Sequence, residues 1–364
     1  MRSYRIRTRA LAVIGLAGLS VGVAGLAHAQ DEPPTRYMEH DLVSDVPGRA
    51  EITDPDLVNA WGMSQTPTSP IWVSDNEPNV ATLYRTSATP PVVTKVALTV
   101  SLPGEGVTGQ VFNPTGLFMV TNDTTMTTAT SVFIFDSESG DVSGWNPGTG
   151  AQVGIHIDGA VFKGLAMIQD TSGAHLLAAD FRNNEIDVID SNWQTAHLPG
   201  SFDDPGLPDG YAPFDVATLG GQVYVAYAMQ DAEGEDEVAG QGRGFVDAYD
   251  LSGNFLRRVA SHGQLNAPWG LAIAPAGFGD LSGALLVGNF GDGRINAYDP
   301  MSGEYLGAMR DATGHRIEID GLWGLMFGNG SSAPRTSLLF TAGPDDEAHG
   351  LFGTLTVAPP KHSD

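Results

Sequence analysis

Six copies of one short pattern follow residue 55, and this repeat restricts the fold more than any other feature of the chain. In each copy an apolar run leads through a turn to a second apolar run that ends in Asp, Asn or an aromatic residue. The turn positions of the first runs are separated by 47, 55, 51, 55 and 54 residues. Periods of this length predict an array of similar supersecondary units. The six turn positions are Gly62, Gly109, Gly164, Asp215, Gly270 and Gly324.

Each copy has the composition of short strands joined by turns. The runs are rich in Val, Leu, Ile, Phe and Tyr, and Gly, Pro, Asp and Asn bound them, as is typical of strands. Most copies add a third run, such as residues 81–84 or 131–135, and a weaker fourth run, such as 95–102. Four strands in roughly fifty residues predict a blade of a β-propeller.

The last copy is one strand short, because the chain ends soon after its third run, residues 349–357. Residues 37–43 belong to no copy, and we predict that they complete the last blade, since ring closure hides strand edges that an open array exposes. We therefore predict an all-β, six-bladed β-propeller with four-stranded blades over residues 37–358. A seven-bladed ring is the main alternative. Residues 30–36 are then a leader and 359–364 a tail.

Residues 1–29 have the layout of a secretory signal peptide. Four arginines precede an uncharged stretch and the small-residue site Ala27-His28-Ala29, which predicts cleavage near Ala29. We expect a periplasmic or secreted protein without stable membrane insertion, a membrane anchor being the weaker reading. The chain contains no Cys, which excludes disulfides, cysteine-ligated zinc and thiol catalysis.

The charge of the chain is strongly negative. The formal net charge is −25, and removal of residues 1–30 with their four arginines takes it to −29 (−25 minus 4). Because a surface of this sign repels phosphate backbones, nucleic acid is not expected as a partner. The acidity has two readings, solubility outside the cell or a role in cation binding.

Polar residues gather at one predicted rim of the ring. In an antiparallel pair the first strand starts where the second strand ends. The residues at the starts of the first strands and those at the ends of the second strands therefore lie over the same end of the central channel. The acidic segment 231–237 is expected on this face. Asn122 is counted as a second-strand end because residues 120–122 align without a gap with Val73-Ser74-Asp75. The predicted binding residues are Asn59, Asn122, Tyr227, Asn266 and Asp320.

Oxygen ligands at this rim favour a hard cation, and calcium is the cofactor that they predict. The alternative is that Asp and Asn terminate strands and satisfy turn backbones. The predicted metal ligands are Asp75, Asp180, Asn289 and Asp345. The predicted catalytic residues are His349 and Asp180. His349 lies beside Asp345 and Glu347, and as a general base it would need a carboxylate to orient it.

Tryptophan precedes the glycine in three of the copies, at Trp61, Trp269 and Trp323. These side chains form either a stacking platform for a ligand or, as we favour, wedges between neighbouring blades. The glycines fit where backbones crowd near the axis.

Five runs of the chain have a specific pattern, and they are residues 265–272, 286–293, 320–325, 341–344 and 349–353. These runs resemble those of a family of uncharacterised exported bacterial proteins. The resemblance covers about residues 41–357 and implies a six-bladed propeller akin to NHL-repeat and gluconolactonase-like proteins. It implies no settled activity and no catalytic residues.

Two functions of different classes fit these residues. Because the sequence contains no nucleophile–base motif, we predict a protein that binds a small molecule, an extracellular polymer or another protein at an acidic central rim. The alternative is a metal-dependent hydrolase, lactonase or lyase that uses Ca²⁺ or Zn²⁺ on a small molecule.

Overall fold

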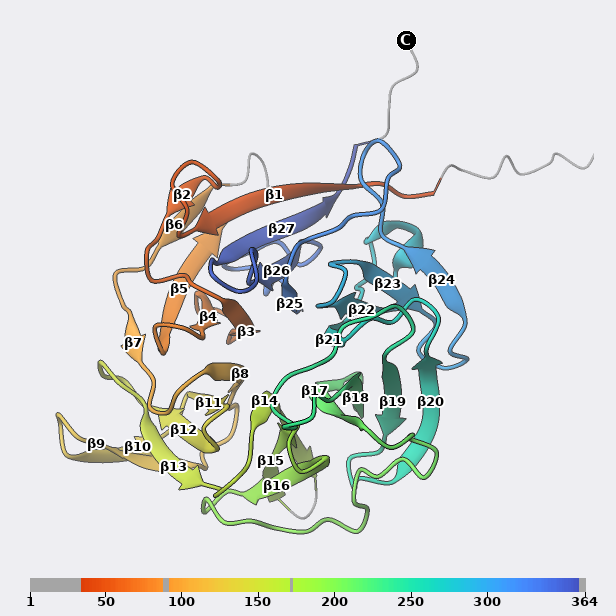
Figure 1. The fold of residues 1–364 in the computed structure, drawn as a ribbon. Coiled ribbons are helices and arrows are strands. Elements are labelled where there is room, and N and C mark those ends of the chain that lie inside the picture. Colours follow the sequence, from red (N-terminus) through yellow and green to blue (C-terminus); the bar gives the residue numbers. More distant parts are fainter. Residues whose placement is uncertain (1–33, 88–91, 171–172, 360–364) are drawn as a thin grey trace, which may run out of the picture. The chain divides into compact units, whose positions relative to one another are not determined.

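The computed structural model describes residues 34–87, 92–170 and 173–359, so the predicted signal peptide lies outside the described residues. The chain divides after Pro34, and the unit that begins at Thr35 contains the strands of the propeller. Figure 1 shows its sheets arranged in a ring around a common centre, which confirms the six-bladed propeller. In the described part of the chain, no helix has the length and apolar character needed to cross a membrane.

Three blades follow one another in the first half of the ring, each named here from its innermost strand outward. The first consists of β3 (Ala60–Ser64), β4 (Ile71–Asp75), β5 (Val80–Thr86) and β6 (Val93–Lys95), with β7 (Val100–Ser101) also on β5. The second consists of β8 (Val107–Phe112), β11 (Phe133–Ser137), β12 (Asp141–Trp145) and β13 (Gln152–His156). The third consists of β14 (Phe162–Asp170), β15 (Gly173–Asp180) and β16 (Glu185–Asp190).

Three further blades complete the ring. The fourth consists of β17 (Tyr211–Leu219), β18 (Gln222–Met229), β19 (Phe245–Tyr249) and β20 (Phe255–Ser261). The fifth consists of β21 (Pro268–Ile273), β22 (Leu285–Asn289), β23 (Ile295–Tyr298) and β24 (Tyr305–Ala308), with the 3-10 turn η1 (Gly279–Leu281) between its first two strands. The sixth consists of β25 (Leu322–Phe327), β26 (Leu338–Ala342), β27 (Leu351–Val357), β1 (Tyr37–Ser44) and β2 (Ile52–Thr53).

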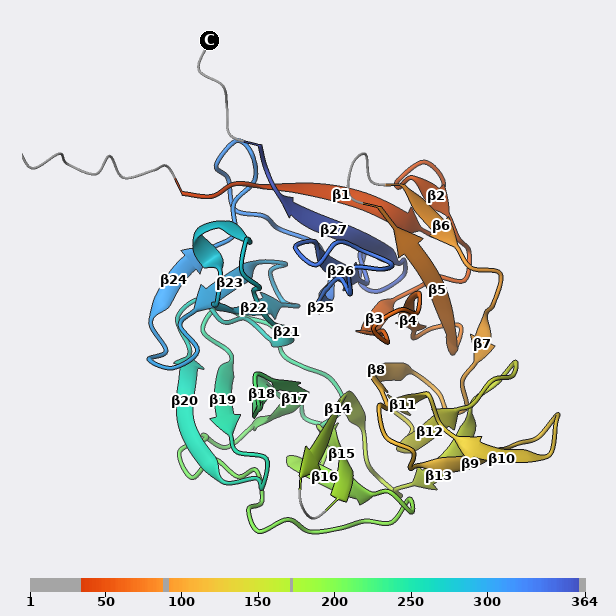
Figure 2. The ribbon, with the colours of Figure 1, turned by 180° about the vertical axis from the view of Figure 1, so that it is seen from behind.

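The N-terminal strand closes the ring, as predicted. β1 pairs antiparallel with β27 from Tyr37 opposite Val357 to Ser44 opposite Leu351, and β2 adds a short parallel edge to it. Figures 1 and 2 both show β1 along the outer side of β27, beside the end of the chain. The last blade therefore combines the two ends of the propeller, and β1 covers the edge of β27.

The second blade corrects one strand assignment. β8 pairs directly with β11, and β9 (Met119–Asn122) pairs only with β10 (Thr127–Thr130) in a separate hairpin. The alignment of residues 120–122 with a second strand was therefore wrong, and residues 131–135 open the second strand rather than the third. A short apolar run predicts a strand but not its partner. The Asn122 side chain, which accepts from the N–H groups of Thr124 and Thr125, stabilises the local hairpin turn instead.

The third blade has three strands in the described residues rather than the predicted four. An isolated antiparallel bridge between Ile189 and Thr195 stands where a fourth strand would pair. The segment 199–208 that follows contains three prolines and two glycines. Proline cannot donate to a ladder and glycine weakens a strand, so this segment runs as a loop.

Candidate functional site

A layer of aromatic side chains lies at the axis of the propeller. Trp61 and Trp323 stack with their ring centroids 3.5 Å apart, and Trp269 meets both rings edge-on at 5.9 and 5.8 Å. Phe214 joins the same buried cluster. We call Trp61, Phe214, Trp269 and Trp323 the aromatic plug. The tryptophans are 0–5% exposed, which confirms a packing role, but they pack across the channel between the first, fifth and sixth blades.

In most blades a glycine directly follows the residue at the axis, as Gly62 follows Trp61. This glycine lets neighbouring innermost strands come into contact. A Cβ atom on Gly62 would lie 2.6 Å from the carbonyl oxygen of Thr108, and one on Gly270 would lie 2.5 Å from that of Trp323. Neither distance is tolerated between atoms that are not bonded. The repeating glycines of the sequence are therefore required by the crowding of backbones around the axis, as predicted.

Lys163 occupies the axial position of the third blade, where four of the other blades place tryptophan or phenylalanine and the second blade places Thr108. Its side chain is buried, its ammonium pairs with Glu138 and lies 3.4 Å from a carboxylate oxygen of Asp236, and it sits 5.5 Å from the centroid of the Trp61 ring. Burial lowers the pKa of Lys163, but the carboxylates of Glu138 and Asp236 outweigh burial and raise the pKa above its usual value. Lys163 is therefore a buried ammonium that depends on its carboxylate partners.

Four acidic side chains from three blades converge around this ammonium. Glu138 comes from the β11–β12 loop, Asp236 and Glu237 from the β18–β19 loop, and Glu347 from the β26–β27 loop. Burial, together with the neighbouring charges of Glu347 and Asp236, raises the pKa of Glu237 to about 8, although a backbone hydrogen bond and Lys163 act in the opposite direction. Burial also raises the pKa of Glu347, although Asn59 donates a 2.6 Å hydrogen bond to it. We call Lys163 and these four carboxyl groups the acidic centre.

The loop that carries Glu347 has an unusual backbone. Asp345, Asp346 and Glu347 have φ angles of 58°, 53° and 65°, three consecutive left-handed residues without a glycine. Each such residue costs about 1–2 kcal/mol. The Asp320 carboxylate, which accepts a 2.9 Å hydrogen bond from the N–H of Asp345, helps to hold the turn. Strain that the surrounding structure maintains is typical of functional sites, and here it directs Glu347 toward Asn59.

A cavity of about 340 Å³ opens beside the acidic centre. Glu138 and Asp236 belong to its wall, together with Glu105 and the ion pair between Arg182 and Glu235. This volume is at the lower end of the range for small-molecule sites. The acidic centre is therefore accessible to a small ligand.

The predicted binding residues divide between this rim and the blades. Asn59 lies in the rim, where it donates to Glu347 and accepts from the indole N–H of Trp323, and Asp320 supports the loop of Glu347. Asn266 accepts from the N–H of Gly240. Tyr227 is buried inside the fourth blade, with its hydroxyl 2.6 Å from that of Tyr249, and Asn122 lies in the inserted hairpin.

The predicted metal ligands belong to four blades. Asp75 is fully buried at the end of β4, and burial raises its pKa well above the usual range. Asp180 accepts from the N–H groups of Val161 and Asn183. Asn289 donates to Asp292 at 2.9 Å. Asp345 is 68% exposed at its side chain and lies 3.9 Å from Arg49.

One compact acidic group among the described residues contains a predicted ligand. The carboxylates of Asp180, Glu185 and Asp187 place oxygen atoms within 4.8 Å of one another. Burial, followed by the charges of Asp180 and Glu185, raises the pKa of Asp187 to about 7. This group belongs to the third blade alone and lies at a strand end, where such residues also terminate turns.

His349 has a carboxylate partner that the sequence did not indicate. Its Nδ1 atom lies 2.7 Å from Asp45, in the loop after β1, and Asp45 also accepts from the N–H of Gly350. The neighbours in sequence, Asp345 and Glu347, point elsewhere: Asp345 toward Arg49 and Glu347 toward Asn59. Asp180 belongs to the third blade and His349 to the loop of the sixth.

Two residues of the acidic centre were missed for identifiable reasons. Lys163 stands directly before a repeat glycine, in the position that holds Trp61, Trp269 and Trp323 elsewhere, and this register was the available signal. Glu138 was not predicted, because residues 131–135 were interpreted as a third strand, whose end lies on the opposite face. The acidic segment 231–237 and Glu347 were expected on the correct face.

Replacement of Glu237 by Gln is expected to change how stability depends on pH. The folded pKa of about 8 exceeds the ordinary value of 4.5, so the folded state keeps this proton longer and the protein loses stability as pH rises from about 4.5 to 8. Glu237→Gln removes that loss. We expect the drop in melting temperature between pH 5 and pH 9 to shrink by about 4 °C, measured by circular dichroism. Glu233→Gln, an exposed residue of the same loop, serves as control, and equal behaviour of the two variants would contradict the assignment.

Comparison with known proteins identifies relatives along most of the chain. No family model matches. The chain is 33% identical over 337 residues to the uncharacterized protein R648 of Acanthamoeba polyphaga mimivirus, covering 88% of this chain and 80% of that protein. It is 31% identical over 332 residues to the uncharacterized protein L690 of the same virus, covering 86% and 84%.

Two solved structures illustrate the structural likeness. A streptogramin B lyase is 10% identical with a TM-score of 0.47, covering 89% of this chain and 98% of that one. A periplasmic gluconolactonase of Pseudomonas aeruginosa is 13% identical with a TM-score of 0.47, covering 86% and 88%.

Proposed function

We propose a binding function for this chain, which belongs to the family of the mimivirus proteins R648 and L690. Its ligand would be a small cation held at the acidic centre, over the end of the channel where the innermost strands begin. Ca²⁺ is the first candidate, because the available ligand atoms are carboxylate and amide oxygens. A larger partner, either an extracellular polymer or a protein, would then have to present a cationic group to this rim.

The observation that supports the proposal is the excess of carboxyl groups over ammonium groups around the buried ammonium of Lys163. Lys163 is one positive charge among Glu138, Asp236, Glu237 and Glu347, and two of these carboxyl groups have raised pKa values. A raised pKa means that the negative form is not fully compensated. A bound cation would supply the missing charge. The strained loop would then position the Glu347 carboxylate to coordinate the cation, rather than serve packing.

Calcium titration of the purified, chelator-treated protein by isothermal calorimetry tests this proposal. We expect binding that Glu347→Gln and Glu138→Gln each weaken at least tenfold, about 1.4 kcal/mol. Asp345→Asn and Asp180→Asn remove residues that the sequence predicted as metal ligands, and we expect both to bind like the unmodified protein. The reverse pattern would assign calcium to the sequence-predicted ligands. Absence of binding for both Ca²⁺ and spermidine would contradict the proposal.

The alternative, a metal-dependent hydrolase, lactonase or lyase, is favoured by one contact. Asp45 orients the imidazole of His349 at 2.7 Å, the arrangement that a general base requires. The same preparations, assayed on lactones and esters with and without Ca²⁺ and Zn²⁺, test this alternative. Absence of turnover under every condition would leave the binding function.

Export of the protein is also part of the proposal. It rests on the arginine-rich, apolar and small-residue order of residues 1–29, and predicts a mature chain in the periplasm or the medium. The two relatives come from Acanthamoeba polyphaga mimivirus, so a bacterial source remains a prediction. The N-terminal sequence of the mature protein would test the cleavage near Ala29.

A further inference from the structure

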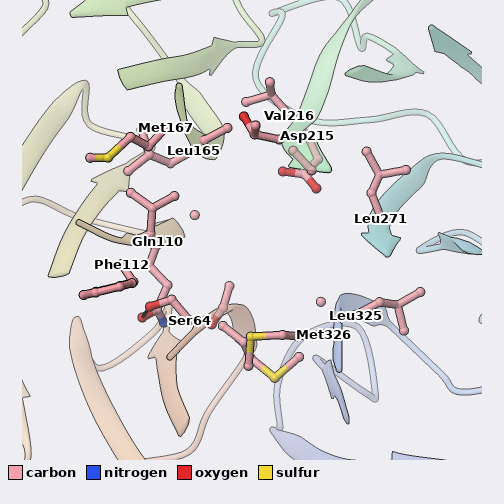
Figure 3. A pocket seen from close by; sticks show the side chains of 18 of the residues that line it. Ser64, Gln110, Phe112, Leu165, Met167, Asp215, Val216, Leu271, Leu325 and Met326 are labelled. Atoms are coloured by element: carbon pink, nitrogen blue, oxygen red, sulfur yellow. Dashed lines mark hydrogen bonds between the residues drawn. The ribbon is translucent and has the colours of Figure 1, made fainter. Parts of the chain in front are cut away.

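A second cavity occupies the other end of the central channel, beyond the aromatic plug (Figure 3). Its volume is about 300 Å³, and all six innermost strands contribute to its wall. Apart from Trp269 of the aromatic plug, the wall residues follow the axial residue of their strand, as Met63 and Ser64 follow Trp61 in β3. The cavity therefore opens on the face toward which the innermost strands run, opposite the acidic centre.

Apolar side chains form most of this wall. Figure 3 shows methionine and leucine side chains around the opening. The polar residue Gln110 is already engaged, because its side chain accepts from Ser64 at 2.7 Å and donates to the Gly62 carbonyl and to Ser74. Flexible thioethers adapt to ligands of different shape. The main apolar side chains are those of Met63, Met167, Met326, Leu165, Leu271 and Leu325.

Asp215 is the charged residue among those that line the cavity. It stands at a turn position that holds glycine in the other five copies. Gly164 of the third blade makes room for it, since a Cβ atom on Gly164 would collide with the Asp215 carboxylate. Asp215 is 7% exposed. The fold thus accommodates a carboxyl group at a crowded position where five other blades have no side chain.

The surroundings of Asp215 give it little compensation. Burial raises its pKa well above the usual range, a hydrogen bond from the backbone of Val216 opposes this, and the nearby charged group that acts on it is another carboxyl, Asp136. An uncompensated carboxylate is costly in an apolar setting. A ligand that brings a positive charge would remove that cost, whereas a neutral apolar ligand would not.

We propose that this cavity binds a small amine with an apolar body, whose ammonium group pairs with the Asp215 carboxylate. The apolar body lies against the methionine and leucine side chains, and the ring of Trp269, which also belongs to the wall, offers its face to the ammonium. A Ca²⁺ ion does not suit this cavity, because it requires six to eight oxygen ligands. The cavity is thus separate from the acidic centre in both position and ligand class.

Calorimetric titration with 2-phenylethylamine and with its neutral analogue 2-phenylethanol tests the proposal. We expect the full-length protein to bind the amine at least tenfold more tightly than the alcohol. Asp215→Asn keeps the shape of the side chain and should weaken amine binding at least tenfold, so that amine and alcohol bind alike. Leu271→Trp fills the cavity and should remove both ligands, which keeps the test decisive if Asp215→Asn does not fold.

Glu347→Gln separates the two ends of the channel. It should leave amine binding unchanged, because Glu347 lies in the acidic centre, and Asp215→Asn should leave calcium binding unchanged. Amine binding that survives Asp215→Asn, or that is lost in Glu347→Gln, would overturn the proposal. So would failure of the unmodified protein to bind the amine, even if calcium binds as expected.

Discussion

Removal of β1 is expected to lower the melting temperature by more than about 10 °C or to cause aggregation. A chain that starts at Asp45 lacks the strand that pairs with β27 at seven positions. It also loses the buried side chains of Tyr37, Leu42 and Val43. The newly exposed edge of β27 would be free to pair with another chain. Circular dichroism and size-exclusion chromatography measure both effects.

Contacts to the fifth blade make the loss of stability on removal of β1 larger than that expected for the loss of one edge strand. The Tyr37 hydroxyl donates to the carbonyl of Phe278 at 3.0 Å, and the two rings lie 4.8 Å apart. β1 therefore joins the fifth and sixth blades as well as closing the ring. A chain that starts at Thr35 keeps the strand and serves as control. Equal melting temperatures for the two truncated chains would show that β1 is dispensable.

Trp323→Ala is expected to lower the free energy of unfolding by about 3–5 kcal/mol, as is usual for large buried aromatic residues. Trp323 is fully buried, stacks on Trp61 and on Phe290, and meets Trp269 edge-on. Truncation leaves a void at the axis, where six rigid blades meet and cannot easily close in. Denaturation in urea, followed by fluorescence and circular dichroism, measures the change.

Trp323→Phe separates packing from hydrogen bonding at the same position. It keeps most of the ring contact but loses the indole N–H that donates to Asn59 at 3.0 Å. Since Asn59 in turn donates to Glu347, we expect this variant to fold with a smaller loss of stability and to bind calcium more weakly.

A loss below about 1 kcal/mol in Trp323→Ala would mean that the plug contributes little to stability.

The fold was predictable because its signals are periodic and local. Glycine recurs directly after the axial residue, and the crowding of innermost strands such as β3 and β8 explains why. Residues 37–43 were expected to pair in the last blade, and they do. The second blade was assigned wrongly because Met119 and Val120 form a plausible strand. This strand, β9, pairs with β10 rather than with β8, and the apolar pattern of a strand does not indicate which of two possible partners it pairs with.

The candidate sites were only partly predictable. The rim was located from the ends of strands, and Asn59, Asp320 and the loop of Glu347 do lie there. The carboxylate partner of His349 was not predicted, because Asp45 is separated from His349 by most of the chain and approaches it only when β1 closes the ring. Asp215 is one of the six turn positions of the repeat, but the sequence did not show that it faces a cavity.

Six blades, the closing strand and the crowded axis were predicted from spacing and from residue size within one repeat. Which charges meet depends on the three-dimensional arrangement of the blades. Lys163, Glu138, Asp236 and Glu347 come from different blades, and their mutual distances depend on how the blades are turned around the axis. The repeat therefore specifies a scaffold, while the residues that break it, Lys163 among aromatic rings and Asp215 among glycines, mark the two ends of the channel where ligands are expected.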